Sequence, residues 1–208
     1  MQKTAKNITL LGTGWLGLPL LRALVADGHR VAGSGRQPER LRAITEAGGQ
    51  AFAIDLPGPI PQAFLKECDC LIITLPPRGR QLGADAADQY LAALRSLPPL
   101  THLSQLIYTS STGVYGNQPG LVNEATPRQP ATHSARAVAA AEDWLRANHP
   151  AVTILRLAGL IGPGRHPGNF FGGRSRAIPD GDAPVNLVHR QDVIAAIRLV
   201  LSEPSPGV

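Results

Sequence analysis

The 208-residue sequence has few aromatic residues, and this scarcity argues against nucleic-acid binding. Aromatic side chains make up 4% of the chain, so the platforms on which bases stack would be rare. The net charge of +5 favours an anionic partner, yet the arginines are scattered and form no basic helix or repeat. Anionic small ligands explain this excess better. A nucleic-acid binder stays an alternative, and its affinity would fall steeply with salt.

Long hydrophobic runs are also absent. No apolar run approaches the roughly 20 residues that span a bilayer, and the N-terminus lacks a signal-peptide pattern. We therefore expect a cytoplasmic protein with no membrane partner. A composition of 43% hydrophobic and 17% charged residues is typical of globular proteins, and the length suits one well-packed domain.

Cysteine is limited to Cys68 and Cys70, on an expected strand. We interpret both as buried structural thiols, with a redox or metal role as the alternative. No set of His, Cys and Asp residues has the spacing of metal ligands, so we expect no metal.

A glycine-rich turn joins the first expected strand to the first expected helix. Residues 8–17 read I-T-L-L-G-T-G-W-L-G, which places Gly12, Gly14 and Gly17 in G-x-G-x-x-G spacing. A strand that turns through glycines into a helix directs several backbone N–H groups at one point, together with the positive end of the helix dipole. Gly12 allows the tight turn, Gly14 lets a pyrophosphate approach, and Gly17 lets helix and strand pack closely. This pattern predicts a dinucleotide site, with an ordinary tight turn as the alternative.

Strand-length apolar runs alternate with helical patterns along the rest of the chain. Strands are expected near residues 8–11, 30–36, 51–56, 68–75, 105–110, 152–157 and 185–188, and helices near 18–27, 38–47, 85–97, 133–148 and 192–201. This alternation predicts an α/β fold with a doubly wound, mostly parallel sheet of the Rossmann type. We expect a single NAD(P)-binding domain over residues 1–208. The glycine- and proline-rich stretch 159–184 would form a small C-terminal substrate cap.

The end of the second expected strand indicates the choice of cofactor. Proteins that bind NAD usually carry an acidic residue there, which holds the ribose hydroxyls. Here the loop reads Ser34-Gly35-Arg36, and the first acid is Glu39. Arg36, with Ser34 and Arg40, could hold a 2′-phosphate through charge-assisted hydrogen bonds, so we predict NADP rather than NAD. The alternative is that these arginines simply lie on the surface.

Five motifs, in order, resemble those of the extended short-chain dehydrogenases/reductases of the NAD-dependent epimerase/dehydratase superfamily. Besides the glycine motif they are Asp55-Leu56, Tyr108–Gly116, Leu155–Gly164 and Val185–Asp192. The resemblance implies a reductase, epimerase or dehydratase that uses NAD(P) on a small sugar-like or carbonyl substrate. The cofactor contacts expected from the pattern and the resemblance are Gly12, Thr13, Gly14, Trp15, Leu16, Gly17, Ser34, Arg36, Arg40, Asp55, Leu56, Leu75 and Pro76.

The Tyr-x-x-x-Lys pair with which this family transfers protons is missing, as in its atypical branch. No tyrosine is followed four residues later by one of the chain's three lysines, and Ser134 and Val138 stand at the corresponding positions. Ser111 matches the family's catalytic Ser/Thr. Tyr115, His133 and Ser134 are the other catalytic candidates. A non-catalytic NAD(P)-binding sensor or regulatory protein is the alternative function.

Substrate contacts are expected from the glycine- and proline-rich stretch. Arg165 there could meet an anionic substrate, with a solvated loop as the alternative. The resemblance also implies a further strand and helix after about residue 207. We therefore expect either a shortened protein or a site completed by a partner subunit, with a homodimer as a possible assembly.

Overall fold

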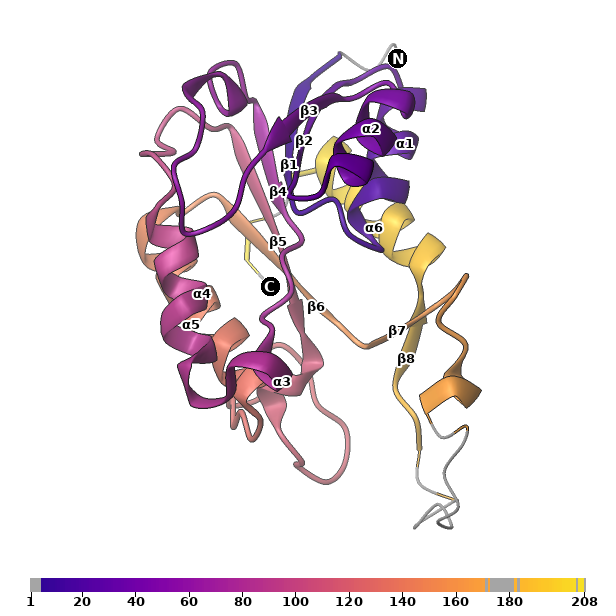
Figure 1. Cartoon of the computed structure of the whole chain (residues 1–208). Helices are drawn as coiled ribbons and strands as arrows, with labels where there is room; N and C mark the ends of the chain where they lie inside the picture. Colours follow the sequence, from indigo (N-terminus) through magenta and orange to yellow (C-terminus); the bar gives the residue numbers. More distant parts are fainter. Residues whose placement is uncertain (1–4, 171, 173–181, 183, 205, 208) are drawn as a thin grey trace.

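Six parallel strands form the central sheet of the protein. The computed structural model describes residues 5–170, 172, 182, 184–204, 206 and 207 (Figure 1). The strand order is β3-β2-β1-β4-β5-β6, and every neighbouring pair is parallel. The strands are β1 (Asn7–Leu11), β2 (Arg30–Gly35), β3 (Gln50–Ala53), β4 (Cys70–Ile73), β5 (Gln105–Ser111) and β6 (Val152–Leu157). This arrangement confirms the predicted doubly wound fold.

Helices cover both faces of the sheet. On one face lie α1 (Gly17–Ala26), α2 (Pro38–Glu46) and α6 (Arg190–Ser202), and on the other lie α4 (Ala86–Arg95) and α5 (His133–Asn148) (Figure 1). The short helix α3 (Gly79–Leu82) follows β4. Single 3₁₀ turns are η1 (Gln62–Phe64), η2 (Gly83–Asp85), η3 (Thr112–Tyr115) and η4 (Pro167–Phe170).

The apolar residues of the strands point into two separate cores, because successive side chains of a strand alternate between the faces of a sheet. One core lies beneath α4 and α5 and contains Cys68, and the other lies beneath α1 and α6 and contains Cys70. Both cysteines are buried and free. Burial raises the pKa of the Cys68 thiol and raises that of Cys70 to about 12, as expected for inert structural thiols.

A second, two-stranded sheet lies apart from the central one, beyond the lower end of α6 in Figure 1. It pairs β7 (Gly159–Ile161) with β8 (Leu187–His189). We call residues 159–170 and 184–189 the arm. The arm overlaps the stretch 159–184, whose role as a substrate cap stays a prediction; residues 171, 173–181 and 183 of that stretch lie outside the described residues.

The observed elements differ from the predicted ones mainly at their ends. Strands β3 and β4 are shorter than predicted, and β7 was not predicted. Helix α6 begins at Arg190, two residues before the predicted start, and its cap is the Nδ1 atom of His189, which accepts from the Gln191 N–H. No helix among the described residues is long and apolar enough to cross a membrane.

Candidate functional site

The glycine loop between β1 and α1 is held in place by the neighbouring strands. Gly12 takes a φ of 103°, which favours glycine, and its N–H donates to Ser34 Oγ at 2.8 Å. Thr13 Oγ1 donates to the Ser34 carbonyl at 2.6 Å, and Thr74 Oγ1 donates to the Gly12 carbonyl. The loop is therefore fixed to the carboxyl ends of both β2 and β4.

This loop presents free donors at the start of α1. Among the described residues, the backbone N–H groups of Trp15 and Leu16 donate no hydrogen bond. The first turn of α1 carries no acidic residue that would compete for them. A Cβ on Gly14 would meet nothing within 4 Å, whereas one on Gly17 would overlap the Gly12 carbonyl. Free amides, open space at Gly14 and the positive helix end suit the diphosphate of a dinucleotide.

A cavity of about 310 Å³ opens at the carboxyl ends of β1, β2 and β4, beside α4. Chain order reverses between β1 and β4, and the crevice at such a point is where open α/β sheets bind ligands. Ten of the thirteen predicted cofactor residues line this cavity, and Trp15, Leu16 and Gly17 do not. The ten are Gly12, Thr13, Gly14, Ser34, Arg36, Arg40, Asp55, Leu56, Leu75 and Pro76.

The residues predicted to select the cofactor lie together at the β2 side of the cavity. Arg36 Nη1 and Asp55 Oδ1 are 3.5 Å apart, with side chains 53% and 75% exposed. Such a solvated pair is weak, so Arg36 can exchange its partner for a phosphate. Arg40 also lines the cavity. Ser34 is 5% exposed and its Oγ accepts from Gly12, so this side chain supports the loop.

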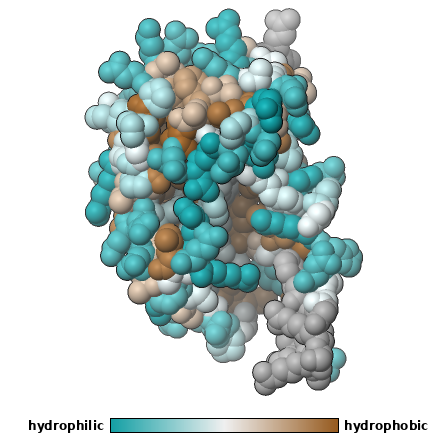
Figure 2. Space-filling view, viewed as in Figure 1, coloured by the Kyte–Doolittle hydropathy of each residue, from teal (hydrophilic) through white to brown (hydrophobic). Residues whose placement is uncertain are grey.

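Ser111 stands at the last position of β5, outside the cavity. Its Oγ accepts from the Gly113 N–H at 3.0 Å, which leaves the hydroxyl proton free to be donated. The next residue, Thr112, accepts from Asn186 Nδ2 of the arm at 3.5 Å. Ser111 is therefore placed where the sheet meets the arm. Figure 2 shows a hollow in the surface between the arm and the part of the molecule that carries α4 and α5.

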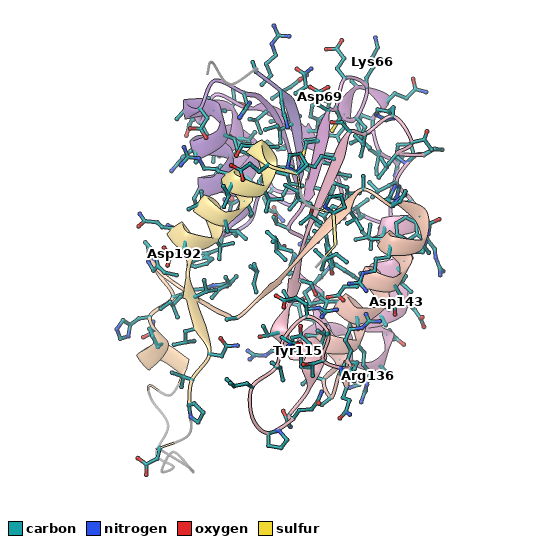
Figure 3. All side chains as sticks on the ribbon, turned by 180° about the vertical axis from the view of Figure 1, so that it is seen from behind. Lys66, Asp69, Tyr115, Arg136, Asp143 and Asp192 are labelled. Atoms are coloured by element: carbon teal, nitrogen blue, oxygen red, sulfur yellow. The ribbon has the colours of Figure 1, made fainter. Side chains whose placement is uncertain are left out.

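The other three catalytic candidates also lie outside the cavity, at the η3–α5 end of the molecule. Tyr115 is 5% exposed, and its hydroxyl accepts from Arg156 Nη1 at 2.8 Å (Figure 3). This geometry makes Tyr115 part of the packing. His133 is exposed at the first residue of α5. Ser134 packs so closely on α3 that a Cβ on Gly79 would overlap its N and Oγ atoms.

The cavity lining also contains residues that the sequence analysis did not name as contacts, among them Arg78, Gln89 and Tyr90. Arg78 follows Pro76-Pro77 after β4 and takes a φ of 51°, so its place just beyond a strand end was the signal that could have found it. Tyr90 donates its hydroxyl to the Leu75 carbonyl at 2.8 Å. Burial raises the pKa of Tyr90, which makes this phenol unsuited to proton transfer near neutral pH.

Comparison with known proteins agrees with this geometry. A family model described as NAD(P)H-binding matches residues 12–204. Protein YeeZ of Escherichia coli (strain K12) is 42% identical over 212 residues, which cover 97% of this chain and 75% of YeeZ.

Two solved structures are also similar. A functionally unknown conserved protein from Silicibacter pomeroyi DSS has a TM-score of 0.74 and 27% identity, covering 98% of this chain and 70% of that one. The UDP-glucuronic acid 4-epimerase from Bacillus cereus, in complex with UDP-glucuronic acid and NAD, has a TM-score of 0.76. Its identity is 18%, over 96% of this chain and 74% of the epimerase, so this likeness concerns the fold.

Proposed function

The chain belongs to the NAD(P)H-binding family, and from this premise we propose that it binds NADP. We further propose that it acts as a reductase, epimerase or dehydratase on a small carbonyl or sugar-like substrate. The observation that carries the proposal is the pair of free N–H groups at Trp15 and Leu16, beside a cavity lined by Arg36 and Arg40. The amides suit a diphosphate, and the guanidinium groups suit a 2′-phosphate.

Each part of the cofactor would meet its own set of residues. Asp55 and Leu56 would hold the adenine, and Leu75 and Pro76 would border the path from the adenosine to the sheet centre. When bound, NADPH supplies the hydride. Ser111 would donate its free hydroxyl proton as a hydrogen bond to the reacting oxygen and so orient the substrate.

Replacing Arg36 by alanine tests the choice of cofactor. We expect R36A to weaken NADPH binding by about 10- to 100-fold and NADH binding much less, because a charge-assisted pair with the 2′-phosphate is worth about 1.5–3 kcal/mol. Thermal shift and fluorescence titration with both cofactors measure this. R42A, at an exposed position of α2 outside the cavity, is the matched control and should bind both cofactors like the parent. Stronger stabilisation of the parent by NADH than by NADPH would contradict the NADP assignment.

Replacing Ser111 by alanine tests the catalytic part. Incubation with NADPH and a panel of carbonyl compounds, followed at the cofactor absorbance, first identifies a substrate. S111A should then lower kcat/KM by about 100-fold, as the loss of one hydrogen-bond donor to a reacting oxygen typically does. The affinity for NADPH should stay within a factor of about two, because Ser111 lies outside the cavity. An unchanged kcat/KM would remove Ser111 from the mechanism.

A non-catalytic NADP sensor is the second candidate function. It is favoured by the missing Tyr-x-x-x-Lys pair and by the packing of Ser134 against Gly79, where the family's phenol would stand. NADPH binding without turnover on any compound of the panel would support the sensor, and turnover of one compound would exclude it.

A further inference from the structure

The indole ring of Trp15, in the glycine loop, contacts two arginines: Arg165 of the arm and Arg190 at the start of α6. The Cζ atom of Arg165 lies 4.4 Å from the centroid of the indole ring, and that of Arg190 lies 4.7 Å from it. The indole Nε1 donates to the Pro163 carbonyl at 2.8 Å, and Arg190 Nη1 donates to the Trp15 carbonyl at 3.2 Å. One side chain of the dinucleotide loop therefore fixes the place of both cations.

The local sequence of the arm explains how Arg165 reaches this ring. Gly162-Pro163-Gly164-Arg165 forms a tight turn in which Gly162 and Arg165 exchange two backbone hydrogen bonds, of 2.8 and 3.1 Å. Gly162 and Gly164 take φ angles of 146° and 75°, which favour glycine. A Cβ on Gly162 would lie only 3.2 Å from His189 Nε2 and 3.3 Å from the Cβ of Arg190, so the glycine also allows the turn to lie close to the start of α6.

The charges of these two arginines are not balanced within the described chain. Arg128, Arg156 and Arg198 each form an ion pair with a carboxylate. In contrast, neither Arg165 nor Arg190 has a carboxylate partner among the described residues.

Arg190 also carries an unsatisfied donor. Its Nε atom is buried and donates no hydrogen bond. A buried donor without an acceptor is unfavourable, and so is the approach of two like charges to one ring. Both costs fall when an oxyanion binds, because guanidinium groups pair with phosphate and carboxylate through charge-assisted hydrogen bonds.

We propose that Arg165 and Arg190, stacked on Trp15, form a subsite for an oxyanion group, a phosphate or a carboxylate, of the substrate. This inference rests on the proposed function and deepens it, because it makes the substrate an acid. The diphosphate of the cofactor is the other source of an oxyanion near Trp15. The free loop amides suit the diphosphate, whereas Arg165 comes from the arm and Arg190 from the start of α6, and the arm also contacts Thr112, the neighbour of Ser111, through Asn186.

Tryptophan emission offers a direct test. In W144F the remaining indole is Trp15. This variant, saturated with NADP⁺, is titrated with inorganic phosphate and separately with acetate at constant ionic strength. We expect a saturable change of emission with at least one of the two anions. The anion that binds more tightly shows whether the acidic group of the substrate is a phosphate or a carboxylate.

Variants of the arginines show whether the change comes from the subsite. R165A, at an exposed position, should weaken anion binding at least 10-fold, and R190K should weaken it several-fold because lysine lacks the Nε donor. R22A, an exposed arginine of α1, is the matched control and should bind the anion as W144F alone does. In R165A the affinity for NADP⁺ should stay within threefold.

The possible failures are distinguishable. If NADP⁺ binds but neither anion gives a saturable change, the subsite is disproved and the proposed function stands. If R165A weakens NADP⁺ as much as the anion, the arginines serve the cofactor and the inference fails. If NADP⁺ itself does not bind, the proposed function and the inference fall together.

Discussion

Replacing Glu142 by glutamine should lower the free energy of unfolding by about 3–5 kcal/mol, the usual effect of removing one member of a buried ion pair. Glu142 is fully buried on α5. Its Oε1 accepts from Ser110 Oγ at 2.6 Å and from Arg156 Nε at 3.0 Å, and its Oε2 accepts from Arg156 Nη2 at 2.7 Å. Arg128 Nη1 also donates to Oε2, at 3.3 Å. One carboxylate thus pairs with two guanidinium groups.

The size of the effect follows from what the glutamine would leave behind. The side chain of Arg156 is 6% exposed, so in E142Q it would stay buried with its charge uncompensated, and the new NH₂ group would face donors. Glu142 and Tyr115 both accept from Arg156, and each raises the pKa of the guanidinium. Glu142 therefore also secures Tyr115 through Arg156.

Urea unfolding tests this prediction: E142Q should show a lower midpoint than the parent, with an unchanged m-value. D143N is the matched control, because Asp143 also pairs with Arg128 but its side chain is 62% exposed. We expect D143N to cost less than about 1 kcal/mol, as exposed pairs do. Should E142Q fall in the same range as D143N, the buried network does not hold β5, α5 and β6 together.

Two alanine substitutions in the glycine loop should separate folding from cofactor binding. A Cβ on Gly14 meets nothing within 4 Å, so G14A should unfold like the parent. If the diphosphate approaches the backbone at Gly14, however, the added methyl group would stand in its place. We expect NADPH affinity to fall by at least about 100-fold, since a clash forces both partners apart and forfeits the contacts to the loop amides.

G17A should lower both the stability of the fold and the affinity for NADPH. A Cβ on Gly17 would overlap the Gly12 carbonyl, so α1 must move away from β1 and the cradle for the diphosphate must open. We expect a loss of stability of about 1–3 kcal/mol, typical of overpacking, together with loss of NADPH binding. Denaturant unfolding and NADPH titration of both variants give the comparison. NADPH binding by G14A at the parent's affinity would place the dinucleotide elsewhere.

The fold could be predicted because its signals are local and repeated. The inner strands of the central sheet are built around short apolar runs, such as Cys70–Ile73 in β4, and each long helix has its own periodicity. The pairing of β7 with β8 left no such signal, since each strand has three residues and they meet across a stretch without periodicity. Likewise His189 is an uncommon N-cap, and it caps α6 because β8 runs directly into the helix at this residue.

The cofactor site was predictable for a similar reason. Its residues follow strand ends in the sequence, and parallel strands bring their carboxyl ends to one edge. Gln89 could not be found in this way, because it reaches the cavity only through the packing of α4. The partnership of Trp15 with Arg165 and Arg190 joins positions about 150 and 175 residues apart, and no spacing within the sequence indicates it.

The two thiols on opposite sides of the central sheet give the molecule a built-in indicator of opening. Each lies in a different core, and burial disfavours the reactive thiolate of both. A thiol-modifying reagent can therefore reach each cysteine only when the packing around it opens. The rates of thiol labelling at Cys68 and Cys70 consequently show which of the two cores opens first.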